Sequence, residues 1–458
     1  MDTDVRDSGG LAFLPAVELL DLLRRGEVSS RELLSVYLER VERINPTVNA
    51  IVTLDAERAL VSAGRADDAR AHGEDWGPLH GLPITVKDVF ETAGLRTTAG
   101  APELSDHVPE TDAALVARLR RAGAIIFAKT NTPAMASDGQ TFNDLFGTTN
   151  NPWDLTRTPG GSSGGCGAAL AAGLTPLSFG SDIAGSIRIP ANFCGVYGHK
   201  PSFGLIPQRG HIPGPPGQLI DRDINVVGPL ARDARDLDLA LSVLAGPITQ
   251  EALGWRAPLA PPRARALSEL RVAAWLDDPS FPVDDSVLVR LEALVEALRS
   301  AGATVDERAR PAGVEFGPAF SLYLRLLRLE EGMTHDEWLE LDQRRQVLRE
   351  GWAELFATYD VLVCPVCSTP PFPHDQRPRG ERQYVINGED RPMSDYVAWP
   401  GLIGMAYLPS TSTPLGPNPN GLPVGVQVVG PHLADRTTID VAHRIRAVIG
   451  GFERPPGY

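Results

Sequence analysis

A run of small residues between Arg157 and Pro190, RTPGGSSGGCGAALAAGLTPLSFGSDIAGSIRIP, constrains this chain more than any other segment. It holds two glycine-serine groups, one at residues 160–165 and one at 184–186. Such residues allow close backbone approach and supply hydroxyl groups. The segment is therefore compatible with a phosphate-binding loop, a serine-hydrolase turn, or a pair of serines that act together.

Phosphate binding is the least favoured of the three. A loop of the form G-x-x-x-x-G-K-[ST] places a lysine directly after its glycines, and no lysine follows them here. The segment also lacks a G-x-G-x-x-G run that opens a helix directly after an apolar strand. We therefore expect no nucleotide site and no cofactor.

The hydrolase turn fits the letters better than the context. Residues 161–165 satisfy G-x-S-x-G with Ser163 as nucleophile. That turn needs a buried strand running directly into the serine, whereas the preceding NNPWDLTRTPGG is rich in proline, asparagine and glycine. His374 and His443 are available downstream for a triad, although His443 lies in an amphipathic helical pattern. A Ser163 hydrolase stays open as an alternative.

Lys87 supports the third interpretation, in which two serines work with a lysine. It follows GLPITV, a run apolar enough to form a buried strand, and unpaired lysine is almost never fully buried. Burial lowers the pKa of a lysine, so that its neutral form can act as a general base. A simple ion pair with Asp88 is the alternative that the residues leave open.

Helical and strand patterns alternate along most of the chain, which predicts an α/β fold. Strands are predicted in GLPITVKDVF, AIIFAK, LTPLSFGSD, LRVAAWLDD, YDVLVCPV and LPVGVQVVG. We expect a large, mixed and mostly parallel sheet with helices on both faces, built as a single domain over residues 1–458. Its parts are an N-terminal helical wrap at 1–75, a catalytic core at 80–245 and a helical covering segment at 310–350.

The N-terminal region carries a helix start signal and a stop signal. Ser29-Ser30-Arg31-Glu32 has the form of a capping box, in which the first serine and the glutamate satisfy each other's backbone N–H groups. It opens RELLSVYLERVERI, which Asn45-Pro46 is expected to end.

Charge and cysteine content narrow the partners and the location. The formal net charge of −15 leaves no excess of cations to neutralise nucleic-acid phosphates. The N-terminus opens with acidic residues and shows neither a signal peptide nor a long apolar run, so a cytoplasmic protein without a membrane segment is expected. Four cysteines make no disulfide framework, and Cys364 and Cys367 lack a second pair for zinc, so no metal is expected.

These motifs together resemble the amidase signature family. Its hallmark is a glycine-serine-rich segment followed by D-x-x-G-S-I-R-x-P, which here occupies residues 160–165 and 182–190. The likeness extends from GLPITVKDVF through AKTNTP and TNNPWDLTRTPGG to VGPLARDARDLDLAL and GLPVGVQVVG. The resemblance implies the amidase signature fold and a hydrolase of C–N bonds.

The family's arrangement of a serine, a cis-serine and a lysine carries over to three residues. Ser186 would be the nucleophile, Ser162 the bridging serine that follows a cis peptide bond, and Lys87 the base. Four backbone N–H groups would form the oxyanion hole, those of Ile183, Ala184, Gly185 and Ser186. Three further residues would support this network: Ser163, Asp182 and Arg188.

Three positions depart from the usual family pattern. Ala184 stands where the family has glycine, and a left-handed backbone at this position would be strained by the alanine Cβ. His199 stands where an aliphatic residue is common, and we interpret it as packing or pocket polarity rather than catalysis. Cys166 replaces a small or acidic residue and is expected to be inert.

Substrate specificity is expected to come from loops outside these motifs. Aromatic, leucine and methionine side chains in two such loops predict an apolar pocket, with core packing as their alternative role. The loop AMASDGQTFNDLFG offers Phe142, Leu145 and Phe146, and YVAWPGLIGMAYLPS offers Tyr396, Trp399, Met405 and Tyr407.

The resemblance therefore implies an enzyme that cleaves small-molecule amides through an acyl-enzyme, with esters and carbamates as further substrates. The main alternative within the family is the glutaminase subunit of a tRNA-dependent amidotransferase, which needs a partner. That subunit usually carries glutamine where this chain has Ile189. A catalytically inactive binding module on the same scaffold is an alternative from another class.

Overall fold

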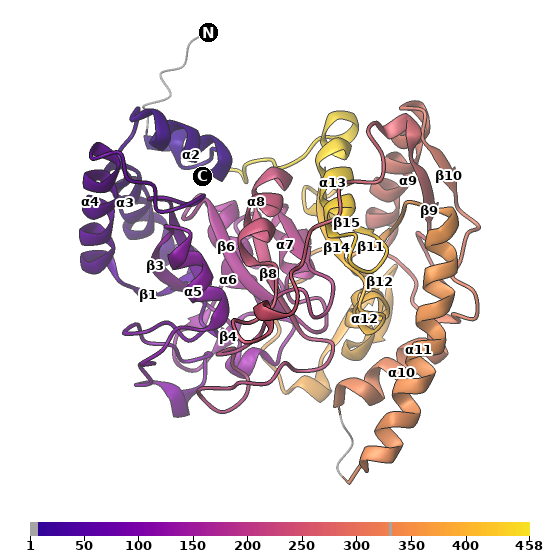
Figure 1. Cartoon of the computed structure of the whole chain (residues 1–458). Coiled ribbons are helices and arrows are strands. Elements are labelled where there is room, and N and C mark those ends of the chain that lie inside the picture. The colour runs from indigo at the N-terminus through magenta and orange to yellow at the C-terminus, as the bar shows by residue number, and fades with distance from the viewer. Residues whose placement is uncertain (1–7, 329–331) are drawn as a thin grey trace.

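The computed structural model describes residues 8–328 and 332–458. Within them, eleven strands form one sheet that runs through the whole molecule (Figure 1). In spatial order these strands are β1 (Ile51–Leu54), β3 (Ile125–Thr130), β2 (Pro83–Lys87), β6 (Leu177–Asp182), β8 (Val226–Ala231), β7 (Tyr197–Lys200), β14 (Ser410–Pro417), β15 (Pro423–Val429), β11 (Val361–Pro365), β9 (Arg271–Ala274) and β10 (Thr304–Asp306). All six strands predicted from the sequence are among them.

The sheet is mixed. Parallel pairs join β3, β2 and β6 on one side of the molecule and β11, β9 and β10 on the other. The pairs between these groups are antiparallel, as is the edge pair of β1 and β3. The two halves of the chain meet in the middle of the sheet, where β7 pairs with β14.

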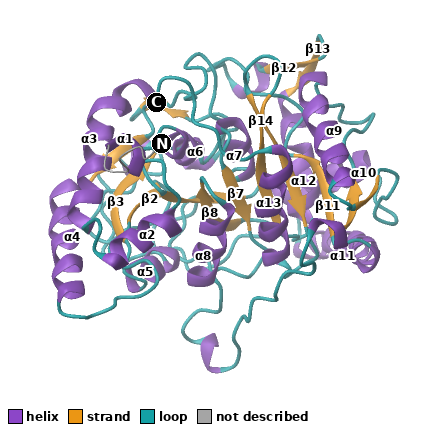
Figure 2. Ribbon diagram, turned by 90° about the horizontal axis from the view of Figure 1, so that it is seen from above, coloured by secondary structure: helices purple, strands orange, loops and turns teal. Residues whose placement is uncertain are grey.

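Helices cover both faces of the sheet (Figure 2). The helices are α1 (Ser8–Leu11), α2 (Ala16–Arg25), α3 (Ser30–Val48), α4 (Ala56–Ala71), α5 (Ala114–Arg121), α6 (Gly164–Ala171), α7 (Arg188–Cys194), α8 (Ala234–Leu244), α9 (Asp285–Ser300), α10 (Phe316–Arg328), α11 (His335–Thr358), α12 (Ala398–Met405) and α13 (Asp435–Ile449). α6 and α7 lie on one face, whereas α8 and α13 lie on the other. Among the described residues, no helix has the length and apolar character needed to cross a membrane.

Two short hairpins lie outside the main sheet. They are formed by β4 (Phe142–Asn143) with β5 (Gly147–Thr148), and by β12 (Gln383–Ile386) with β13 (Glu389–Pro392). Three 3₁₀ turns also matter for the site: η2 (Ala134–Ala136), η5 (Arg379–Glu381) and η6 (Met393–Val397).

The start of α3 confirms the predicted capping box. Ser29 Oγ accepts a hydrogen bond from the Glu32 N–H at 3.1 Å, and the Glu32 carboxylate accepts one from the Ser29 N–H at 2.8 Å. The helix opens where the sequence indicates because both otherwise unpaired N–H groups are satisfied. Residues 1–7 of the wrap predicted at 1–75 lie outside the described residues.

The predicted end of α3 is wrong by a few residues. Pro46 lies inside the last turn, and the helix continues to Val48. A proline is tolerated there because the turn closes without its N–H: the Asn49 N–H donates to the Asn45 carbonyl oxygen at 2.7 Å. The Asn45 side chain accepts from the N–H of Ile51, which fixes the direction in which the chain enters β1.

Two helices of the predicted covering segment at 310–350 stand off the sheet. α10 and α11 follow one another along one side of the molecule, in orange in Figure 1. α11 begins at a second capping box, in which Thr334 and Glu337 satisfy each other's N–H groups. Residues 329–331, between the two helices, lie outside the described residues.

Gly351 lies in α11 and faces the chain segment before α10. A Cβ at this position would lie 1.9 Å from the Ala312 carbonyl oxygen. We expect Gly351→Ala to lower the free energy of unfolding by about 1 to 3 kcal/mol, because helix or loop must shift, and the better helix propensity of alanine offsets only part of this cost. Gly317→Ala in α10 is the matched control, since its Cβ would be 3.8 Å from its nearest neighbour, Ser280 Oγ. Thermal unfolding measures both variants, and equal melting temperatures would contradict the prediction.

Candidate active site

Lys87 and Asp182 end two neighbouring strands, β2 and β6. Because these strands are parallel, their carboxyl ends lie at the same edge of the sheet. Ser181 precedes Asp182 at this edge, and the loop that carries Ser162 leads into α6 directly above it. The candidate site therefore gathers at the carboxyl ends of two buried strands, a common place for active sites in α/β proteins.

Lys87 is fully buried between two serine hydroxyls. Its Nζ lies 2.6 Å from Ser162 Oγ and 3.2 Å from Ser181 Oγ. Burial lowers the pKa of Lys87 to about 7, against a smaller opposing effect of nearby anionic groups. The ion pair with Asp88 that the sequence left open does not form, because the Asp88 carboxylate accepts from the N–H and hydroxyl of Thr98 instead. Lys87 can therefore be neutral near pH 7 and accept a proton.

Ser162 follows a cis peptide bond from Gly161. Its neighbour Ser163 ties this loop to the turn of Ser186: the Ser163 N–H donates to the Ser186 carbonyl oxygen at 3.1 Å. The Ser163 hydroxyl donates to the Ser181 carbonyl oxygen at 3.4 Å. Ser163 is fully buried and borders neither of the cavities at Ser186. Its position is that of a structural residue and gives no support to Ser163 as a nucleophile.

Asp182 and Arg188 form a fully buried ion pair under the turn that presents Ser186. The guanidinium donates to both carboxylate oxygens at 2.9 Å, and three backbone N–H groups of the turn donate to the same carboxylate. Burial alone would raise the pKa of Asp182, but the charge and hydrogen bonds of Arg188 outweigh it and lower the pKa to about 2. The ionised carboxylate therefore fixes the shape of the turn.

The turn offers fewer free N–H groups than the sequence implies. The Gly185 N–H lies 2.8 Å from Asp182 Oδ1 and is already engaged. The N–H groups of Ile183, Ala184 and Ser186 donate to none of the residues that the structure describes. The predicted four-donor oxyanion hole is thus corrected to three candidate donors.

Ala184 fits the turn without the backbone strain that a left-handed conformation would cause. Its φ is not in the left-handed region; the left-handed position of the turn is Gly185, with φ of 96°. A Cβ on Gly185 would lie 2.7 Å from Ile189 Cδ1 and 2.9 Å from Pro400 Cβ. Glycine is therefore required at 185, whereas position 184 accommodates alanine.

Two cavities meet at Ser186. The smaller chamber, with a volume of about 320 Å³, is lined by Met135, Ala136, Ser137, Ser162, Ser181, Ile183, Ser186, His211, Pro213, Arg222, Asp223, Asn225, Leu326, Leu327 and Trp338. The larger chamber, with a volume of about 750 Å³, is lined by Ala136, Ser137, Asp138, Gly139, Gly161, Ile183, Ala184, Ser186, Leu324, Leu327, Arg379, Gly380, Arg382, Gln383, Pro392, Met393, Ser394, Tyr396 and Val397. α10 contributes to both chambers and α11 to the smaller one.

Most of the residues predicted to form the pocket lie elsewhere, which corrects that prediction. Trp399 and Met405 are buried in the core between α12 and its neighbours, and Trp399 Nε1 donates to the Phe281 carbonyl oxygen. Their apolar character serves core packing, which was the alternative role for these side chains. Tyr407 borders neither chamber, although its hydroxyl donates to Asp223, which lines the smaller one.

The loop with Phe142, Leu145 and Phe146 also lies outside both chambers. The Phe142 ring packs under the Arg382 guanidinium at 5.2 Å, so it supports the wall of the larger chamber from behind. Of the aromatic residues predicted for the pocket, Tyr396 does line the larger chamber.

Sequence reasoning missed two polar residues of the smaller chamber. Ser181 contacts Lys87, and its place directly before Asp182 is the signal that could have identified it. His211 is buried, and its Nε2 has no hydrogen-bond partner among the described residues. Burial, helped by the positive charge of Lys87, lowers the pKa of His211 to about 3, so its ring is neutral. No sequence pattern marks His211, because it lies in an irregular loop.

The other candidate groups lie away from Ser186. His199 is buried between Thr411 and Asp435, at 2.9 and 3.1 Å from their oxygens, in a structural position. Cys166 packs under β6 and contacts Thr130 Oγ1 at 3.0 Å. No cluster of three or more histidine, cysteine, aspartate or glutamate side chains within the described ranges could hold a metal ion.

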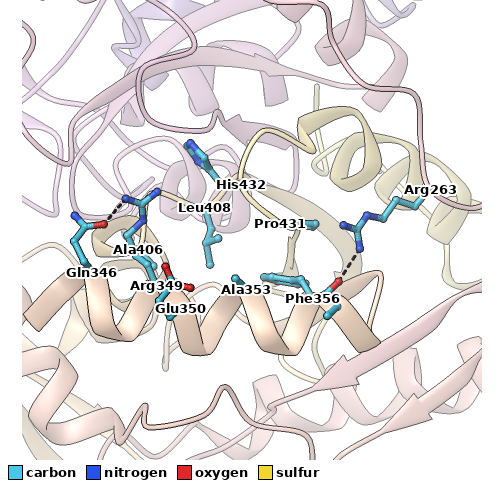
Figure 3. Close-up of a pocket in the computed structure, with 11 residues that line it drawn as sticks. Arg263, Gln346, Arg349, Glu350, Ala353, Phe356, Ala406, Leu408, Pro431 and His432 are labelled. Carbon is cyan, nitrogen blue, oxygen red and sulfur yellow. Dashed lines mark hydrogen bonds between the residues drawn. The ribbon is translucent and has the colours of Figure 1, made fainter.

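A separate cavity of about 440 Å³ lies along α11 (Figure 3). Its two arginines bond to the helix itself: Arg349 to the Gln346 side chain and Arg263 to the Phe356 carbonyl oxygen. None of the site's serines borders this cavity, so we place the candidate site in the two chambers at Ser186.

Comparison with known proteins agrees with this geometry. The family model described as Amidase matches residues 32–324 and 317–439. A glutamyl-tRNA(Gln) amidotransferase subunit from Moorella thermoacetica is 34% identical over 485 aligned residues, which cover 94% of this chain and 96% of that protein.

Solved structures with the same fold include two that exceed one quarter identity. The structure of 6-aminohexanoate cyclic dimer hydrolase complexed with substrate has a TM-score of 0.79 and 26% identity, covering 97% of this chain and 99% of that one. A chain from a structure described as an unexpected vestigial protein complex that reveals the evolutionary origins of an s-triazine catabolic enzyme has a TM-score of 0.82 and 28% identity, covering 96% and 100%.

The chain belongs to the amidase signature family, as its sequence motifs indicate. It is a C–N hydrolase of that family.

The two neighbouring positions of the turn give a matched test of its geometry. We expect Gly185→Ala to lower kcat/KM by about a hundredfold or more, because the added Cβ displaces the turn that presents Ser186 and its free N–H groups. Ala184→Gly should change kcat/KM by less than about threefold, since the backbone at 184 needs no left-handed conformation. Steady-state kinetics of both variants measure this. Similar losses in the two would show that the turn tolerates neither change and would refute the assignment.

Proposed function

We propose that this enzyme hydrolyses small-molecule amides by acyl transfer to Ser186, with Ser162 and Lys87 as its proton relay. The observation that carries the proposal is the 2.6 Å contact between Lys87 Nζ and Ser162 Oγ, next to a chamber that Ser162 and Ser186 share. The resident base is thus a buried lysine, and no histidine is needed for nucleophile activation.

Acylation follows from this order of groups. Ser186 Oγ attacks the carbonyl carbon, its proton moves to Ser162 Oγ, and the Ser162 proton moves to the neutral amine of Lys87. The carbonyl π electrons move to oxygen and form an oxyanion. When the C–N bond breaks, the relay runs backwards and delivers a proton to the leaving nitrogen. Ser186 is left as an acyl ester.

The oxyanion is stabilised by the free N–H groups of the turn. Those of Ile183, Ala184 and Ser186 have no acceptor within the described residues and are preorganised by the Asp182 carboxylate, which occupies the N–H groups of Gly185 and Ile187. Donors that need no reorganisation are the main source of transition-state stabilisation in acyl transfer. Because Asp182 is held ionised by Arg188, this scaffold keeps its shape across the working pH range.

Deacylation uses the same relay. Water enters where the amine has left, gives its proton through Ser162 to Lys87, and attacks the acyl ester of Ser186. The acid leaves when the Ser186 oxygen takes back a proton. Esters and carbamates fit the same steps, since neither changes the bonds made at Ser186, so we propose them as further substrates.

A second candidate function is glutamine hydrolysis for an amidotransferase. It is favoured by the relatives named as amidotransferase subunits, of which the Moorella thermoacetica protein matches 94% of this chain at 34% identity. In that case the leaving group is ammonia and a partner protein uses it. Ile189, where the glutaminase subunit usually has glutamine, argues for the small-molecule amidase.

Release of 4-nitroaniline from a short acyl 4-nitroanilide by the purified chain tests the proposal. We expect turnover without any partner, and a loss of at least about a thousandfold in Ser186→Ala. Glutamine is tested in parallel by ammonia release. Ser163→Ala is the matched control, and a larger loss in Ser163→Ala than in Ser186→Ala would assign the nucleophile to Ser163 instead.

The buried lysine sets the pH dependence. Because the pKa of Lys87 is lowered to about 7, we expect kcat/KM to rise with pH below about 7 and to level off above it, as the neutral amine becomes the dominant form. Lys200 is also buried with a pKa of about 7, so Lys200→Met should retain the same limb if Lys87 is responsible. Initial rates between pH 5 and 10 give the profile. A rate that falls steadily above neutrality would exclude a lysine base.

A further inference from the structure

The two chambers at Ser186 have different relations to the relay, and this inference rests on the proposed amidase function. The proton for the leaving nitrogen comes from Ser162, and of the two chambers Ser162 borders the smaller one. The leaving amine must therefore depart into the smaller chamber, since the proton donor must lie within hydrogen-bond reach of its nitrogen.

The remaining substituent of the reacting carbon then has one place to go. In the tetrahedral intermediate the carbon carries Ser186 Oγ, the oxyanion, the leaving nitrogen and the acyl chain. The oxyanion faces the turn, whose Ala184 borders the larger chamber. With the nitrogen directed to the smaller chamber, the acyl chain extends into the larger one.

The larger chamber combines an apolar wall with two arginines. Leu324 and Leu327 of α10 and Val397 supply apolar surface beside Ser186. Such a wall suits the methylene groups of an acyl chain. The two arginines, Arg379 and Arg382, approach from the segment around η5.

The two arginines differ in their partners. Arg382 is buried and bonds to Asp138 at 2.7 Å, so its charge is compensated inside the chamber wall. Arg379 is exposed and donates to the Ser137 carbonyl oxygen at 2.8 Å. No carboxylate within the described part of the chain pairs with Arg379. In a chain of net charge −15, it is an uncompensated cation at the chamber that receives the acyl group.

The Arg379 charge is also felt at the catalytic turn. The Tyr323 hydroxyl donates to the Ile183 carbonyl oxygen at 3.2 Å. Burial raises the pKa of Tyr323, and the positive charges of Arg188 and Arg379 partly oppose that rise. Arg379 therefore lies within electrostatic range of the turn that presents Ser186.

We propose that Arg379 selects substrates whose acyl group ends in an anion, so that the enzyme acts on monoamides of short dicarboxylic acids. The apolar wall receives the methylene groups, and the guanidinium binds the terminal carboxylate. Hydrolysis breaks the C–N bond with one water and releases a dicarboxylate and an amine. Glutamine shares this pattern, because its side-chain amide is attached to a chain that ends in a carboxylate.

The test compares two isosteric substrates, glutaryl 4-nitroanilide and pentanoyl 4-nitroanilide, which differ in the terminal carboxylate. We expect the wild-type enzyme to favour the glutaryl compound by about fivefold to tenfold in kcat/KM, an estimate that allows for the exposure of Arg379. Arg379→Gln should bring the ratio near one. Added salt should reduce the wild-type preference, which a purely structural role would not explain.

Arg222 provides the matched control, because it lines the smaller chamber. Arg222→Gln should keep the glutaryl preference. Loss of the preference in Arg222→Gln but not in Arg379→Gln would place the acyl group in the smaller chamber and overturn the assignment. Equal wild-type rates for the two anilides would overturn the role of Arg379.

A binding measurement separates this inference from the proposed function. If neither anilide is hydrolysed, the amidase proposal fails, and calorimetric titration with glutarate and pentanoate then examines the chamber directly. Binding of glutarate that is lost in Arg379→Gln supports the anion site. Absence of glutarate binding to the wild-type enzyme contradicts it.

Discussion

The buried pair of Asp182 and Arg188 is the interaction on which the site depends. A carboxylate removed from water is costly unless charge and hydrogen bonds compensate it, and here a bidentate guanidinium and three backbone N–H groups do so. The compensation has a geometric result: the chain after β6 must curl around the carboxylate. That curl directs the unbonded N–H groups of the turn outward and holds Ser186 between the two chambers. Gln427 of β15 also accepts from Arg188, which joins the turn to the C-terminal half of the sheet.

The reacting groups and the groups that surround the substrate come from different parts of the chain. Lys87, Ser162 and Ser186 lie on or beside β2 and β6, in the N-terminal half of the sheet. The chamber walls come largely from α10, α11 and residues 379–397, which the C-terminal half carries. The rigid sheet thus fixes the relay, whereas standing-off helices and loops shape the space around it. Specificity can then change without disturbing the buried hydrogen bonds of Lys87.

Short-range features were the ones that the sequence could predict. The capping box of α3, the six strands and the motif residues of the turn all depend on neighbouring residues, and the family resemblance indicated Lys87 and Ser162. The chamber walls could not be predicted, because a pattern shows that Trp399 or Met405 is apolar but not which surface it packs against. Gly185 shows the same limit: its N–H was expected to face the substrate, and only the position of the Asp182 carboxylate reveals that it is engaged. The antiparallel middle of the sheet likewise depends on pairing between strands about two hundred residues apart, such as β7 and β14.

Burial of lysine has a consequence for the whole fold. Lys87, Lys129 and Lys200 are all buried, and burial lowers their pKa values to about 7, 8 and 7. In the unfolded chain these amines titrate near 10.4, so between about pH 7 and pH 10 the unfolded state binds protons that the folded state does not. Mass action then shifts the folding equilibrium toward the native state as pH rises through this window, and the full cost of burying three ammonium groups is met below it. The physical chemistry that gives the enzyme its base also ties the persistence of its fold to neutral and alkaline surroundings.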